Sequence, residues 1–264
     1  MVIDMDLINN KIENQIGTIT FNNESKRNCL NKTMIEEIIR VLAEFKNEKV
    51  RVVIIRANKG VRVWSSGFDI HELPQSGRDP LSYFNPLEQL LRDIQMFPAP
   101  VVAMIEGSVW GGACDLAFCC DMLIGTNTAS FAITPAKIGV PYNPSGILNF
   151  INMVGLNMAK EMFFTGLPIN AIQAKHHGIL NHLAPNSDEL ETFTMFQAEH
   201  MIKNSPLSIA VIKEQLRLLS GSHPLSPDTF ERIHGLRTKV LDSADYREGI
   251  SAFIEKRAPN FCNE

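Results

Sequence analysis

Three short, nearly continuous apolar runs constrain the fold of this chain more than any other feature of its sequence. They lie at residues 50–57, 101–105 and 122–125. Runs of this kind are typical of strands that are covered on both faces, as in a parallel sheet flanked by helices. Stretches with helical patterning separate the runs, so the sequence predicts an α/β fold.

The helical stretches are recognised by their apolar spacing and their end signals. Asn31 is a candidate N-cap for a helix over residues 32–47, with Ile35, Ile38, Ile39 and Leu42 on one face. Helices are also predicted at 87–96 and 112–120, and a half-buried strand at 15–21. From residue 187 onward the strand signal fades, and the predicted elements are helices at 190–203, 207–219, 227–241 and 246–256.

The composition of the 264 residues argues against several classes of protein. A formal charge of −4 provides no basic stripe for a nucleic acid. The acidic start of the chain and the lack of an apolar run of about 18 residues favour a cytoplasmic protein that binds no membrane. The five cysteines form an odd set without a Cys-x-x-Cys pair, which predicts reduced thiols.

Two glycine-containing segments carry the strongest functional signal. The first is Trp64-Ser65-Ser66-Gly67-Phe68-Asp69-Ile70, which follows the run that ends at residue 57. The second is Glu106-Gly107-Ser108-Val109-Trp110-Gly111-Gly112-Ala113, which follows the next run. Gly112 stands where a helix begins, so its N–H is not used by the helix and is able to bind an anion.

In this order and at this spacing, the two segments resemble the paired signatures of the crotonase (enoyl-CoA hydratase/isomerase) superfamily. The resemblance implies a crotonase-like spiral of strand-strand-helix units with a helical C-terminal part. It also implies that the amides of Phe68 and Gly112 form an oxyanion hole for a thioester oxygen. Main-chain groups do this work, so the side chain at Phe68 is free to vary.

The hydratases of this superfamily use two acidic residues to activate water. The first of these positions is Asp115 here, but Pro135 stands at the second. Because proline neither takes nor gives a proton, half of the acid/base apparatus of a hydratase is missing. An enoyl-CoA hydratase or isomerase is therefore the less favoured reading.

A narrower resemblance accounts for the missing glutamate. Residues 67–74, 77–83, 107–113 and 139–143, and the tail through residues 210–214 and 255–257, are similar to the bacterial methylmalonyl-CoA decarboxylases. That family has histidine at the position of Phe68 and glutamate at the position of Asp115, and the second departure leaves the role of Asp115 open. The resemblance implies a carbon–carbon lyase that converts methylmalonyl-CoA to propionyl-CoA without biotin or metal.

Decarboxylation is consistent with these residues, because the electrons of the breaking carbon–carboxylate bond generate the enolate and no base is needed. The reaction requires an oxyanion hole, a carboxylate held in a poorly solvated place and a proton donor for C2. Tyr142 is the candidate near the reacting carbon, where it orients the carboxylate or helps to deliver the proton. The structural alternative is that Tyr142 only packs.

The resemblance also suggests residues that hold coenzyme A as part of the substrate. Lys26 would meet a phosphate, Ser66, Gly67, Phe68, Asp69 and Ile70 would present their backbone to the adenine and pantetheine, and Thr134 would lie near the acyl end. Lys256 is expected to reach CoA, from its own or a neighbouring subunit.

Residues 1–190 are expected to form the acyl-CoA-binding core. Residues 191–264 are expected to form a helical region through which the chain packs into a homo-oligomer, either a trimer or a dimer of trimers.

The histidines at 176, 177 and 182 do not have the spacing of metal ligands. A Gly-x-Ser-x-Gly nucleophile elbow is also missing. A non-catalytic CoA-binding assembly protein stays open as an alternative of a different class.

Overall fold

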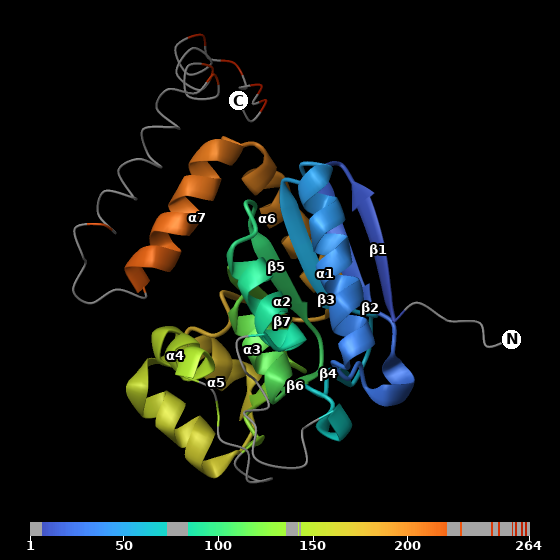
Figure 1. Cartoon of the computed structure of the whole chain (residues 1–264), viewed down its shortest axis with the longest axis vertical. Helices are drawn as coiled ribbons and strands as arrows, with labels where there is room; N and C mark the ends of the chain where they lie inside the picture. The colour runs from blue at the N-terminus through green and yellow to red at the C-terminus, as the bar shows by residue number, and fades with distance from the viewer. Residues whose placement is uncertain are drawn as a thin grey trace, which may run out of the picture.

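The structure of the protein is a computed structural model, which describes residues 7–72, 84–135, 142 and 144–220, together with isolated positions beyond residue 220. Figure 1 shows the chain with its α-helices and the strands β1 to β7 labelled. Within the described part, no helix combines the length and the apolar character that a membrane crossing requires.

Ten strands and seven α-helices are described. The strands are β1 (Ile8–Glu13), β2 (Ile16–Phe21), β3 (Val52–Ala57), β4 (Val63–Ser65), β5 (Val101–Ile105), β6 (Ser108–Trp110), β7 (Met122–Thr126), β8 (Ser130–Ala132), β9 (Ile169–Asn170) and β10 (His182–Ala184). The helices are α1 (Lys32–Asn47), α2 (Pro86–Gln95), α3 (Gly112–Phe118), α4 (Pro144–Thr165), α5 (Ala171–His176), α6 (Ser187–Ile202) and α7 (Pro206–Ser220), and two 3₁₀ turns are η1 (Glu24–Lys26) and η2 (Ile70–Glu72).

The strands form two sheets that the chain visits in turn. A six-stranded sheet has the order β1-β2-β3-β5-β7-β10, and a four-stranded sheet has the order β4-β6-β8-β9. In the successive units β3-β4-α2, β5-β6-α3 and β7-β8-α4, the first strand joins the larger sheet and the second joins the smaller one. This repetition is the predicted spiral of strand-strand-helix units, and the α/β fold class is confirmed.

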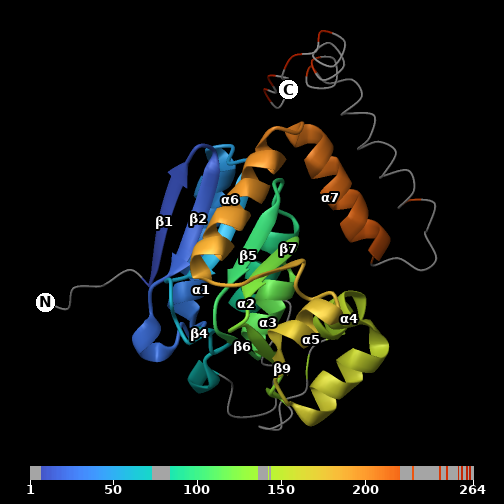
Figure 2. The ribbon, with the colours of Figure 1, turned by 180° about the vertical axis from the view of Figure 1, so that it is seen from behind.

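Both faces of the larger sheet are buried, as the apolar runs predicted. In β3, Val53 and Ile55 face the cluster that includes α1 and α2, whereas Val52 and Ile54 face the cluster that includes Leu190 of α6. Figure 1 shows α1 and α2 in front of this sheet, and Figure 2 shows α6 across its opposite face. The site-bearing loops therefore start from strands that are held on two sides.

Most predicted helices agree with the structure to within a few residues. The side chain of Asn31 caps α1 by accepting a hydrogen bond from the Met34 amide at 2.9 Å, as predicted. Helix α3 ends at Phe118 rather than at residue 120. The long helix α4, interrupted at Gly155, was not predicted from the sequence. The predicted helices at 227–241 and 246–256 lie outside the continuously described residues.

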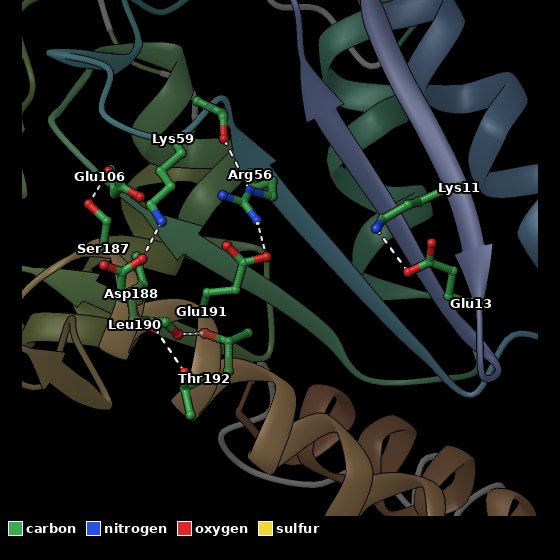
Figure 3. Close-up of polar contacts among 12 residues, drawn as sticks. Lys11, Glu13, Arg56, Lys59, Glu106, Ser187, Asp188, Leu190, Glu191 and Thr192 are labelled. Carbon is green, nitrogen blue, oxygen red and sulfur yellow. Dashed lines mark hydrogen bonds and ion pairs between the residues drawn. The ribbon is translucent and has the colours of Figure 1, made fainter.

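Helix α6 is anchored at its start by polar contacts, which Figure 3 shows. Arg56 of β3 binds Glu191 at 3.1 Å, Lys59 pairs with Asp188, and the Ser187 hydroxyl donates to Glu106 at 2.8 Å. The expected division of the chain at residue 190 falls within this helix, and that division stays a prediction.

Candidate active site

The first glycine segment is a loop that leaves the end of β4. The Leu30 amide donates to the Gly67 carbonyl at 2.9 Å, and the Asp69 amide donates to the Leu30 carbonyl at 3.2 Å. These two bonds form a parallel bridge between Leu30 and Phe68. Because the groups on either side of Phe68 point toward Leu30, the N–H of Phe68 itself points the other way.

The second glycine segment turns sharply from β6 into α3. Gly111 has a φ of 51°, in the left-handed region that favours glycine, and its amide donates to the Ala132 carbonyl at 2.8 Å. Gly112 is the first residue of α3, so its N–H lacks an acceptor within the helix. The helix start therefore presents a free amide at the end of β6.

These two amides lie close together. A Cβ on Gly112 would come 3.4 Å from the nitrogen of Phe68, and a Cβ on Gly67 would come 3.2 Å from the nitrogen of Gly112 and 2.4 Å from the carbonyl oxygen of Trp110. Within the described part of the chain, neither the Phe68 amide nor the Gly112 amide donates a hydrogen bond to a protein acceptor. The backbone thus offers two adjacent donors, the arrangement that an oxyanion hole requires.

The turn that contains Lys26 is fixed against the end of β4. Lys26 is exposed at the end of η1, and the next two residues, Arg27 and Asn28, adopt left-handed conformations with φ of 55° and 50°. The fully buried Asn28 side chain donates to the Trp64 carbonyl and accepts from the Asn23 amide, both at 3.0 Å.

Sequence reasoning did not assign a role to Asn28, although asparagine is enriched at left-handed positions and this preference is a local signal. Ser65 adds a second link, because its hydroxyl donates to the Asn28 carbonyl at 2.7 Å. The Lys26 turn and the Phe68 loop are consequently one packed unit.

Of the other residues predicted to contact CoA, four lie near the two glycine turns and one lies outside the described residues. Ser66 and Asp69 are partly buried beside Gly67 and Phe68, and the backbone of Ile70 begins η2. The Thr134 hydroxyl lies 3.9 Å from where a Cβ on Gly111 would be, which puts it next to the glycine turn. Lys256 lies outside the described residues.

Asp115 of α3 and Tyr142 form a hydrogen-bonded pair. Asp115 lies three residues after Gly112 on α3, about 5 Å along the helix axis. Its side chain is fully buried, and its Oδ2 accepts a hydrogen bond from the Tyr142 hydroxyl. Its other oxygen, Oδ1, has no partner among the described residues.

Burial raises the pKa of both members of this pair. Burial raises the pKa of the Asp115 carboxyl to about 7, with the Tyr142 hydrogen bond opposing the shift and the nearby Glu88 adding to it. Burial, followed by the Asp115 charge, also raises the pKa of the Tyr142 hydroxyl well above its usual range. The carboxyl of Asp115 therefore changes charge near neutral pH.

Tyr142 stands in the wall of an apolar cavity of about 370 Å³. Its ring packs edge-to-face on Phe163 and Phe150, with interplanar angles of 68° and 88° and centroid distances of 4.8 and 5.9 Å. Pro135 lines the same cavity, and Lys160 is the one charged residue in the part of its lining that the structure describes. A carboxylate placed here would be poorly solvated.

The described residues contain no group of three or more His, Cys, Asp or Glu side chains that could hold a metal ion. His176 and His177 lie at the end of α5, and His182 packs on Phe193.

Comparison with known proteins gives a consistent picture. The sequence profile of the enoyl-CoA hydratase/isomerase family matches residues 11–264. The chain is 48% identical to the methylmalonyl-CoA decarboxylase of Escherichia coli K12, over 94% of this chain and 95% of that protein. It is 28% identical to the 2,3-dehydroadipyl-CoA hydratase of the same organism, over 94% and 96% of the two chains.

Solved structures show the same relationship. A methylmalonyl-CoA decarboxylase in complex with 2-nitronate-propionyl-CoA superposes with a TM-score of 0.80 at 46% identity, covering 98% of this chain and 99% of that one. An enoyl-CoA hydratase/carnithine racemase from Magnetospirillum magneticum gives a TM-score of 0.88 at 26% identity, covering 98% and 97%. The backbone is thus common to decarboxylases and hydratases, and side chains must separate them. The chain belongs to the enoyl-CoA hydratase/isomerase family.

Proposed function

We propose that this protein is a carbon–carbon lyase that decarboxylates methylmalonyl-CoA to propionyl-CoA through a thioester enolate. The observation that carries the proposal is the pair of adjacent amides at Phe68 and Gly112, which donate to no acceptor among the described residues. An apolar cavity lined by Tyr142 and Pro135 adds to it, because Tyr142 is hydrogen-bonded to Asp115 of the helix that Gly112 begins. The 48% identity to a methylmalonyl-CoA decarboxylase over nearly the whole of both chains supports the same reaction.

The proposed reaction uses the two amides to stabilise negative charge. The thioester oxygen accepts hydrogen bonds from the N–H groups of Phe68 and Gly112, and these bonds strengthen as the enolate forms. The electron pair of the breaking bond between C2 and the carboxylate flows into the thioester, and CO₂ leaves. Protonation of C2 then gives propionyl-CoA.

The apolar cavity contributes by weakening the solvation of the substrate carboxylate. Loss of CO₂ removes the localised charge of the carboxylate, so a dry environment destabilises the reactant more than the delocalised transition state. Tyr142, in the cavity wall, orients the carboxylate with respect to the plane of the thioester. Pro135 keeps this wall free of a second carboxylate, which would repel the substrate.

Binding of the CoA part is assigned to the unit formed by the Lys26 turn and the Phe68 loop. Lys26 is exposed and available to a phosphate, while the backbone of Ser66, Gly67, Asp69 and Ile70 lines the path of the adenine and pantetheine. Thr134 lies beside the glycine turn, at the acyl end. Lys256 is proposed as a further CoA contact, and the assembly is proposed to be a trimer or a dimer of trimers.

The direct test is to incubate the purified protein with malonyl-CoA, methylmalonyl-CoA and crotonyl-CoA and to identify the products by mass spectrometry. We expect propionyl-CoA and CO₂ from methylmalonyl-CoA. Efficient hydration of crotonyl-CoA with methylmalonyl-CoA untouched would refute the proposal in favour of a hydratase, with Asp115 as its acid/base. Retention of CoA without turnover of any thioester would indicate a non-catalytic CoA-binding protein.

A further inference from the structure

Asp115 is a buried carboxyl group that has no role in the oxyanion hole. It touches Tyr142 through Oδ2, and its Oδ1 has no partner among the described residues. A buried carboxylate normally collects several hydrogen bonds, because its charge is costly to remove from water. With a single donor, the neutral acid is the form that this site suits.

The groups that face Asp115 strengthen this preference. They are Glu88 on α2, Cys114 on its own helix, Cys119 directly after that helix, and the Tyr142 hydroxyl. Glu88 raises the pKa of Asp115, and burial raises the pKa of both thiols, which keeps them neutral.

Helix α4, which packs against α3, adds Phe150 and Phe163 around the Tyr142 ring. Its cation Lys160 is exposed and lines the cavity that Tyr142 borders. None of the cations among the described residues is an interaction partner that lowers the pKa of Asp115. The substrate carboxylate in the cavity would add a further negative charge on the other side of Tyr142.

We infer that Asp115 is a positioning residue that acts through Tyr142: as the neutral acid it donates to the Tyr142 oxygen, and it replaces the proton that Tyr142 gives to C2. This inference rests on the proposed function. With Asp115 donating, the hydroxyl hydrogen of Tyr142 is free to point at the substrate carboxylate. With Asp115 ionised, that hydrogen is held by Oδ2 and is turned away from the substrate.

The proton transfer balances without a further reactant. After CO₂ leaves, the enolate C2 takes the hydroxyl proton of Tyr142, and a C2–H bond forms. The Asp115 proton moves to the Tyr142 oxygen at the same time, so tyrosinate, which burial disfavours, is never formed. Asp115 is left as a carboxylate and takes a proton from water before the next turnover.

The first experiment measures decarboxylation between pH 5 and 9 in the wild type, Asp115→Asn, Asp115→Glu, Tyr142→Phe and the Asp115→Asn/Tyr142→Phe double variant. We expect wild-type kcat to fall as pH rises through the titration of Asp115. Asp115→Asn keeps a donor to Tyr142 but has no proton to give, so kcat should drop by about 10²-fold or more, with KM within about threefold and the alkaline fall abolished.

The other variants separate this role from a merely structural one. Asp115→Glu keeps an acid and should retain the alkaline fall. The double variant should be no slower than Tyr142→Phe, because Asp115 acts only through Tyr142. Asp93→Asn is a matched control, since burial also raises the pKa of Asp93 but its neighbours are Arg92, Lys46 and Gln89, and it should keep the wild-type profile. The inference would be overturned if the losses of kcat in Asp115→Asn and Tyr142→Phe added up in the double variant. It would also be overturned if kcat of Asp115→Asn still fell at alkaline pH as in the wild type.

The second experiment follows the reverse half-reaction, the exchange of the C2 hydrogens of propionyl-CoA with D₂O, by mass spectrometry. Exchange starts with Tyr142 taking a C2 proton as Asp115 takes the Tyr142 proton, so it needs ionised Asp115. Its rate should rise with pH through a pKa near 7, opposite to decarboxylation.

The exchange measurement also distinguishes the two proposals. Exchange with this pH dependence but no decarboxylation would refute the proposed function and leave the Asp115–Tyr142 relay standing. If the protein decarboxylates methylmalonyl-CoA but Asp115→Asn leaves the exchange rate unchanged, the proposed function stands and the Asp115–Tyr142 relay is refuted. A protein that shows neither reaction would overturn both.

Discussion

The amide nitrogen of Gly112 lies beside Gly67, so close that a Cβ on Gly67 would come within 3.2 Å of it. Residues 45 positions apart in the chain are brought together because β4 and β6 are neighbours in the smaller sheet and each glycine turn follows its strand directly. The two donor amides, of Phe68 and Gly112, therefore lie just beyond the ends of two paired parallel strands, and the pairing of these strands brings them together.

This arrangement makes a direct prediction for Gly112. Gly112→Pro deletes the N–H at the first position of α3, where proline is otherwise tolerated in a helix, and decarboxylation should fall by about 10²–10³-fold. Gly112→Ala is the matched control, because it keeps the N–H and adds only a Cβ at 3.2–3.4 Å from Leu87 and Phe68. Steady-state rates and CoA-ester binding would be compared, and equal rates for the two variants would contradict the donor role.

A second prediction concerns the side chain of Phe68. The N–H of Phe68 is directed by the bridge to Leu30, which involves only backbone atoms, so Phe68→His should keep the donor in place. Turnover should stay within about tenfold, roughly 1.4 kcal/mol of barrier. A loss of several orders of magnitude in a variant with an unchanged circular dichroism spectrum would show that the phenyl ring shapes the site.

The raised pKa of Asp115 also leads to a prediction about the stability of the fold. The carboxyl titrates near its ordinary value of 3.8 when unfolded and near 7 when folded, so the folded state binds this proton more tightly. The contribution of Asp115 to stability is therefore lost as pH rises from about 4 to about 7 and stays lost above.

Asp115→Asn removes this titration and keeps a donor to Tyr142. Its free energy of unfolding should exceed that of the wild type above pH 7 by on the order of 1–4 kcal/mol, and the difference should vanish below pH 4. Urea denaturation at pH 3.5, 5 and 8 measures this. Parallel pH dependences in the two proteins would show that Asp115 is not the carboxyl that penalises folding at high pH.

Much of the fold was predictable from the sequence, because burial on two faces leaves a clear signal. The apolar runs of β3, β5 and β7 and the cap at Asn31 were correctly identified. The three-residue strands β4, β6 and β8 were not, since so short a segment has no measurable alternation. Helix α4 was missed because its apolar residues show little preference for one face, and Gly155 breaks its pattern.

The site was predictable to a different extent. The two glycine turns were found because each combines glycine with the end of a buried strand, and their resemblance to a known family gave them a role. The contact between Asp115 and Tyr142 was not predicted, since a hydrogen bond across 27 residues depends on how α4 packs against α3. The role of the buried Asn28, which joins the Lys26 turn to β4, was missed because its hydrogen bond to the Trp64 carbonyl spans 36 residues.

The last prediction concerns Pro135, which separates a decarboxylase from a hydratase on a shared backbone. Pro135 lines the apolar cavity together with Tyr142, so Pro135→Glu would place a carboxylate where the substrate carboxylate is proposed to lie. At about 4–6 Å and an effective dielectric constant near 20, two like charges repel by roughly 3–4 kcal/mol, so methylmalonyl-CoA turnover should fall by about 10²–10³-fold.

Hydration of crotonyl-CoA by Pro135→Glu should reach at most a trace, because Asp115 is already engaged by Tyr142 and does not hold a water. Pro135→Gln is the control, since it removes the proline ring without adding charge and should retain most of the decarboxylase activity. Both activities would be assayed side by side on the three proteins. Efficient hydration by Pro135→Glu would mean that the second glutamate alone distinguishes the two reactions, and that the Asp115–Tyr142 bond opens readily when an enoyl-CoA binds.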